Sequence, residues 1–167
     1  YTMATNVQEA IAKANMIVCA SPFKQRTLTV SEIQLLQQWI EQGGVFVAPA
    51  ITNTNNHLCA LFGMESVMYS KERKTFTWRD EYLAEKELEY FNEVEERTVS
   101  LGKARNITAE SIKTYGYQPT TAEAMAYFDD TNIVAVLRNR IGKGMIYTFG
   151  ILWRDVVQRS QLGKNTA

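Results

Sequence analysis

Hydrophobic positions near the N-terminus change from a helical spacing to a continuous run. Residues 6–14 place Val7, Ala10, Ile11 and Ala14 on one helical face. The apolar run at residues 16–20 is typical of a strand buried on both faces, as in a parallel sheet. The pattern therefore predicts a short helix followed by a short buried strand.

The strongest local signal lies in residues 28–50, LTVSEIQLLQQWIEQGGVFVAPA. Thr29 and Glu32 have the spacing of a capping box, in which each side chain accepts a backbone N–H at the start of a helix. Gly43 and Gly44 supply the left-handed stop after that helix. The apolar stripe of the helix consists of Ile33, Leu36, Trp39 and Ile40. With the strand before it and the strand at 45–50 after it, the helix predicts a βαβ unit with a right-handed crossover.

The middle of the chain has a different texture. Residues 58–64 indicate a short helix that ends at Gly63, and polar alternation favours short strands at 65–70 and 74–78. Residues 80–97 are charge-dense and fit a solvated helix or an irregular excursion. Residues 97–102 resemble one more strand.

Three strands are predicted in the C-terminal third, at 123–128, 133–139 and 144–151. The turns between them are 129–132, which includes Asp129 and Asp130, and 141–144. A helix from Trp153 to Gln161 is expected to close the chain. These elements predict one α/β domain over residues 1–167, with a mostly parallel central sheet and a C-terminal antiparallel hairpin.

Composition narrows the classes of function. The 18 basic and 18 acidic residues cancel, so no overall field favours nucleic acid. No apolar run approaches the roughly 18 residues needed to cross a bilayer, so no membrane insertion is predicted. Cys19 and Cys59 lie in apolar surroundings and are expected to be buried free thiols. Because the chain begins at Tyr1, we expect a piece of a longer protein.

Candidate binding residues follow the predicted strands, because ligands of open parallel sheets bind beyond the carboxyl ends of the strands. Trp153 offers an aromatic face for stacking after the last predicted strand. His57 follows the loop that comes after the predicted strand at 45–50. The polar candidates are Ser21, Thr52, Asn53, Asn55, Asn56, Arg154 and Asp155. The alternative is that the asparagines are ordinary turn residues that tolerate left-handed geometry.

Catalytic chemistry is harder to support. His57 is the only histidine, and Cys59 falls in a predicted helix, where burial makes a thiol inert. Ser21 lacks the GxSxG surroundings of a nucleophile elbow. A hydrolase or esterase that uses Ser21 or a cysteine with His57 therefore stays as an alternative, and no catalytic residue is assigned.

The sequence has no clear motif for a cofactor or a metal, and only a few aromatic side chains that suit a sugar. One histidine with scattered carboxylates lacks the spacing of a metal site, so none is predicted. The segment Gly142-Lys143-Gly144 joins two predicted strands, so Lys143 is expected to lie at a solvated hairpin tip. A phosphate loop would instead need a helix after its glycines, and no cofactor is therefore predicted. Some aromatic side chains could stack on sugars, although core packing is favoured for most of them. They are Phe76, Trp78, Tyr82, Tyr115 and Tyr117.

Two segments resemble a known superfamily. Residues 28–50 resemble the helix, Gly-Gly and strand of the class I glutamine amidotransferase-like superfamily, which is flavodoxin-like. Residues 132–155, NIVAVLRNRIGKGMIYTFGILWRD, resemble the closing hairpin, strand and helix of its carbohydrate-associated branches. Those branches include the amidotransferase-like domain of bacterial β-galactosidases and the ThuA-like proteins. The resemblance implies a three-layer sandwich, and a bacterial protein of the cytoplasm or envelope.

The superfamily's catalytic residues do not carry over to this chain. Active members have a cysteine after the strand that corresponds to 45–48 and a histidine late in the chain. This chain has Pro49-Ala50-Ile51 at the first place and no histidine after His57. The fold also expects a strand before residues 6–14, which this chain lacks. The resemblance therefore implies a non-catalytic domain of a larger carbohydrate-related or envelope protein. Such a domain would bind a carbohydrate or small-molecule ligand, or pack against a neighbouring domain or a second copy. A purely structural oligomerisation module is the remaining alternative.

Overall fold

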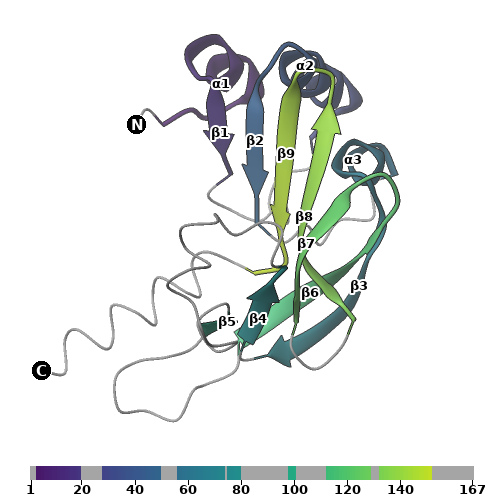
Figure 1. Ribbon diagram of the computed structural model, residues 1–167. Coiled ribbons are helices and arrows are strands. Elements are labelled where there is room, and N and C mark those ends of the chain that lie inside the picture. Colours follow the sequence, from purple (N-terminus) through teal and green to yellow (C-terminus); the bar gives the residue numbers. More distant parts are fainter. Residues whose placement is uncertain are drawn as a thin grey trace, which may run out of the picture.

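The computed structural model describes residues 3–19, 28–49, 56–73, 75–79, 98–100, 112–128 and 132–151. Figure 1 shows its helices and strands in space. The helices are α1 (Val7–Lys13), α2 (Val30–Glu41) and α3 (Asn56–Phe62). The strands are β1 (Met16–Val18), β2 (Val45–Ala48), β3 (Met64–Arg73), β4 (Thr75–Trp78), β5 (Thr98–Ser100), β6 (Ile112–Pro119), β7 (Glu123–Phe128), β8 (Val134–Ile141) and β9 (Gly144–Phe149).

Helix α2 has the ends that its sequence predicts. The Thr29 hydroxyl accepts from the Glu32 backbone N–H at 3.2 Å, and the Glu32 carboxylate accepts from the Thr29 N–H at 2.9 Å. Both halves of the capping box are therefore present. Gly43, with a φ of 120°, adopts a backbone conformation that side-chain-bearing residues avoid, and it ends the helix. The βαβ unit β1–α2–β2 is confirmed.

The sheet is mixed. Its order is β1-β2-β9-β8-β7-β4-β5, and β6 connects β3 to β8. Only β1–β2 and β2–β9 are parallel pairs among the described strands; the other pairs are antiparallel. The prediction of a mostly parallel sheet is therefore wrong, whereas the C-terminal antiparallel hairpin β8–β9 is confirmed. The reason is that a parallel pair needs a crossover connection, such as α2 between β1 and β2, whereas β9 follows β8 through a short turn that favours an antiparallel pair.

Strand β6 was not predicted from the sequence. Its centre contains Gly116 and it ends at Pro119, two residue types that are depleted in strands. Thr114, Tyr115 and Tyr117 are nevertheless buried, because β6 pairs with β3 along most of its length. Tertiary pairing thus makes a strand of a segment whose local pattern is weak.

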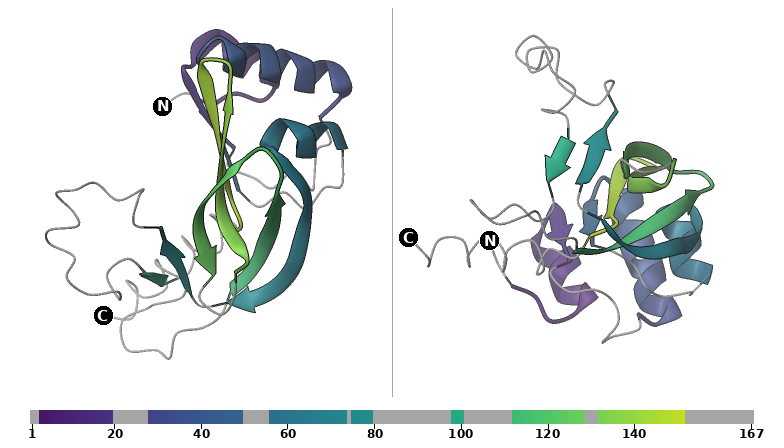
Figure 2. Two further views of the ribbon diagram at one scale, coloured as in Figure 1. Left: turned by 45° about the vertical axis from the view of Figure 1, so that its right-hand side comes forward. Right: turned by 90° about the horizontal axis from the view of Figure 1, so that it is seen from below.

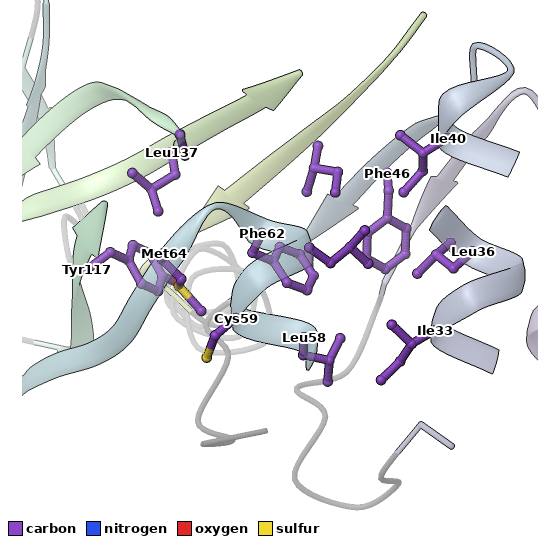
Figure 3. Packing of buried hydrophobic residues seen from close by; sticks show 14 of the residues in the cluster. Ile33, Leu36, Ile40, Phe46, Leu58, Cys59, Phe62, Met64, Tyr117 and Leu137 are labelled. Carbon is purple, nitrogen blue, oxygen red and sulfur yellow. The ribbon is translucent and has the colours of Figure 1, made fainter. Parts of the chain in front are cut away.

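The three described helices contact one another in series and cover one face of the sheet (Figure 2, right). The main core lies beneath them. Ile33, Leu36 and Ile40 of α2 point towards Phe46 of β2, and Phe62 of α3 fills the space beside them (Figure 3). The Phe46 and Phe62 ring centroids are 5.9 Å apart. None of the described helices is long and apolar enough to cross a membrane.

The opposite face of the parallel strands carries a second apolar surface. We call it the back face and define it by Met16 and Val18 of β1, Val45 and Val47 of β2, and Met145 and Tyr147 of β9, which lie in register. Met16 and Val18 are 58% and 56% exposed. Among the described residues β1 is covered on one face only, so the prediction of burial on both faces is not met there, because β1 is the edge strand of the described sheet and the described helices lie on the other face.

Candidate functional site

The carboxyl ends of β1, β2 and β9 meet at one edge of the sheet, because these three strands run parallel. Cys19, Pro49 and Gly150 follow them. The Cys19 N–H donates to the Val47 carbonyl at 2.8 Å, and the Gly150 N–H donates to the Ala135 carbonyl at 2.7 Å. Backbone hydrogen bonds thus hold the strand ends in place and define the edge where a ligand of this fold class is expected.

Thr148 adds an unexplained polar group at this edge. It stands beside Ala48 in the register of β9 and β2, and its side chain is completely buried. Its Oγ1 has no hydrogen-bond partner within the described part of the chain. Burying a hydroxyl without a partner costs about 1–3 kcal/mol, so the position of Thr148 is unfavourable for stability. No sequence pattern singles out Thr148, since threonine is common in strands.

Two of the predicted binding residues lie in the described structure. Asn56 and His57 form the first turn of α3 and are both exposed. Six others fall outside the described residues and stay predictions. They are Ser21, Thr52, Asn53, Asn55, Trp153 and Arg154. Asp155, the turn 129–131, the segment 80–97 and the predicted helix 153–161 lie outside as well.

Cys19 and Cys59 do not form a disulfide with each other, as predicted. Cys59 is buried, and its desolvation raises the pKa of the thiol, whereas Cys19 is only half-buried. Residues two apart on a helix point to nearly opposite sides. Buried Cys59 and exposed His57 therefore do not face each other as a nucleophile and its base. Within the described ranges, no three His, Cys, Asp or Glu side chains gather as metal ligands do.

The aromatic side chains serve the core. Phe76, Tyr115 and Tyr117 are buried, and the Tyr117 hydroxyl donates to the Phe149 carbonyl at 2.8 Å. Trp78 is half-buried, with its ring 5.6 Å from that of Phe76 and 6.3 Å from that of Phe149. Core packing is thus confirmed for the described members of the set; Tyr82 lies outside them.

The turn between β8 and β9 is a solvated tip, as predicted. Gly142 has a φ of 56°, and Lys143 is exposed. The Lys143 N–H donates to the carbonyl of Glu41 at the end of α2 at 3.0 Å. This turn is therefore anchored to a helix C-terminus and does not form a phosphate loop.

Known proteins resemble this chain in structure but not in sequence. No family model matches it, and no curated protein does either. Its fold is shared by a putative ThuA-like protein from Bacteroides uniformis, with a TM-score of 0.57 and 9% identity over 95% of this chain and 71% of that one.

Two glycosidases contain the same fold as one part of a longer chain. An exo-β-1,4-mannosidase from an Opitutaceae bacterium matches with a TM-score of 0.55 and 17% identity, over 93% of this chain and 25% of that one. A GH42 β-galactosidase from G. stearothermophilus matches with a TM-score of 0.57 and 16% identity, over 96% of this chain and 22% of that one. The chain thus spans a quarter or less of the glycosidases that it matches. At these identities the likeness shows the fold alone.

Proposed function

We propose that this chain is a non-catalytic, amidotransferase-like domain of a larger bacterial protein concerned with carbohydrates. Its role is to bind a carbohydrate or small-molecule ligand, or to pack against a neighbouring domain or subunit. One observation carries the proposal. Nearly the whole chain superimposes on about a quarter of two glycosidases, so the same fold occurs beside catalytic domains that act on sugars.

The strand ends support the non-catalytic part of the proposal. In active members of the superfamily that the sequence resembles, a cysteine follows the strand equivalent to β2. Here Pro49 occupies the first position after β2 and is buried. Cys59 is in the core of α3 with a raised thiol pKa, which disfavours the nucleophilic thiolate. Neither residue can attack a carbonyl from where it stands.

Glutamine hydrolysis tests this part of the proposal. Ammonia release from glutamine by the purified chain is expected to equal the rate without protein, because Pro49 stands where active members have their cysteine and Cys59 is buried in α3. An active glutamine amidotransferase in the same assay shows that the conditions support turnover. Glutaminase activity that Cys19→Ala or Cys59→Ala abolishes would contradict the proposal.

We propose in addition that the fold is completed as a three-layer sandwich. Parallel strands are usually buried on both faces, and β1, β2 and β9 have the continuous apolar sequences of such strands. The back face therefore needs a cover. The chain leaves β9 from the middle of the sheet, with α2 and α3 already packed against β9. A helical layer against the back face is the cover that we propose.

Charge substitutions distinguish a covered back face from an open one. Val18→Lys is expected to lower the free energy of unfolding by about 2 kcal/mol, because it places an unpaired ammonium group beneath the proposed third layer. The matched control is Val30→Lys in the first turn of α2, where valine is similarly exposed and a change within about 0.5 kcal/mol is expected. Urea unfolding measures both.

Two outcomes would contradict the proposed cover. The first is an equally small effect of both substitutions. The second is a loss of stability in Val18→Lys that coincides with dissociation of an oligomer, as measured by light scattering. In that case a second copy of the chain would be the cover. A concentration-independent monomer that Val18→Lys destabilises and Val30→Lys does not supports the proposal.

A further inference from the structure

A hollow of about 490 Å³ opens at the end of β8, away from the carboxyl ends of the parallel strands. Its walls come from Ala60 of α3, from Thr121 and Glu123, and from residues 138–142. It exists because β7 begins at Glu123, which pairs with Arg138. Beyond Arg138, β8 continues to Ile141 with β9 on one side, so its other edge faces the hollow.

The wall nearest α3 is rigidly built. Gly63 has a φ of 69°, and its carbonyl accepts from the backbone N–H groups of Thr120 at 2.8 Å and Ala122 at 3.0 Å. Asn139 is only 6% exposed, and its Nδ2 donates to the Leu61 carbonyl at 2.9 Å. These bonds join the end of α3, the turn between β6 and β7, and β8, and they orient the amide of Asn139 before any ligand arrives.

Hydrogen-bond donors remain unused in this hollow. Asn139 Nδ2 carries two hydrogens and makes one hydrogen bond, while its Oδ1 accepts from the Thr121 hydroxyl at 3.3 Å. Arg140 is exposed and has no hydrogen bond or ion pair within the described part of the chain. Its guanidinium has five N–H donors and no acceptor. The hollow therefore favours a ligand that is rich in acceptors.

Charge sharpens this preference. The Arg138 guanidinium is paired with the Glu123 carboxylate. Its Nη2 and Nε both donate to Glu123 Oε2, at 2.5 Å and 3.2 Å. That pair is neutral as a unit, so Arg140 contributes the one unmatched charge of the lining. A planar guanidinium matches the two oxygens of a carboxylate, and such charge-assisted bonds are the stronger ones.

We propose that this hollow binds the carboxylate of a small, hydroxyl-rich acid, with a sugar acid as the ligand class. Arg140 and Asn139 are consecutive in β8, so their side chains lie on opposite faces of the sheet. The ligand therefore lies against the unpaired edge of β8, where Arg140 holds the carboxylate from one face and Asn139 and Thr121 bind hydroxyl groups from the other. The sugar part of this inference rests on the proposed function. The carboxylate part rests on the unmatched guanidinium and the spare donor of the hollow.

The test is an NMR titration of the full chain with two ligands, sodium galacturonate and the neutral sugar galactose. Both titrations are done at the same ionic strength. Galacturonate is expected to bind at least tenfold more tightly than galactose and to shift the amide signals of residues 138–142. Arg140→Gln should weaken galacturonate about tenfold, because it removes the charged partner. Glu123→Gln should tighten it severalfold, because it releases Arg138.

Lys143→Gln is the matched control, since Lys143 is an exposed cation nearby that does not line the hollow. It should change the affinity by less than twofold. An equal loss in Lys143→Gln and Arg140→Gln would show non-specific attraction and overturn the inference. No binding of galacturonate would overturn it too. Equal binding of both sugars, unaffected by Arg140→Gln, overturns the carboxylate site but leaves the proposed carbohydrate role intact.

Discussion

Replacing Gly144 with alanine is expected to destabilise the protein by about 3 kcal/mol or more, the upper end of the cost of overpacking. A Cβ at this position would lie 2.0 Å from the Ile40 carbonyl oxygen and 2.4 Å from that of Gly44. Both atoms belong to the backbone, at the end of α2 and at the start of β2. They cannot move away without separating β9 from the helix. Thermal and urea unfolding measure the loss.

Gly43→Ala is the control for this prediction. A Cβ there would meet nothing closer than 4.0 Å, although its φ of 120° strains any side-chain-bearing residue. Its cost is therefore backbone strain alone, about 1–3 kcal/mol. If Gly144→Ala proved no more damaging than Gly43→Ala, the close approach of β9 to α2 would be wrong.

Truncating Phe62 to alanine is expected to lower the free energy of unfolding by about 3–5 kcal/mol. Phe62 is completely buried and packs against Phe46 where α3 meets the sheet. The substitution leaves a cavity that the surrounding helices cannot fill. Met3→Ala, at a side chain that is 85% exposed, should change stability by less than about 0.5 kcal/mol.

The Phe62 substitution also links the core to the hollow. Phe62 follows Leu61, whose carbonyl holds the Asn139 amide. Loosening α3 should therefore weaken galacturonate binding in the fraction of protein that remains folded. Unchanged stability of Phe62→Ala in urea would contradict the packing of α3 beneath the sheet.

Sequence patterns located most of the described elements. The helices at 6–14, 28–42 and 58–64 and the strands at 123–128, 133–139 and 144–151 lie within a few residues of α1, α2, α3, β7, β8 and β9. What the patterns did not supply was the direction of pairing. An apolar strand has the same appearance in a parallel and an antiparallel pair, so the mixed sheet could not be told from the mostly parallel one that we expected.

The candidate site was less predictable. Asn56 and His57 were named because they follow β2, and they do begin α3. Thr148 and Arg140 were not named, since nothing in their neighbouring residues distinguishes them from ordinary strand residues. Thr148 became notable only because β2 and β8 enclose its hydroxyl, and Arg140 only because Glu123 pairs with Arg138 instead.

The sequence by itself determined the features that depend on residues a few positions apart. The capping box of α2, its glycine stop and the β8–β9 turn belong to this group, because each is an interaction within one turn of chain. The tertiary structure decided the order of the strands, the edge position of β1, the strand character of β6 and the hollow. Those depend on segments far apart in the chain, such as Ala60, Thr121 and Arg140, and only the packed core brings them together.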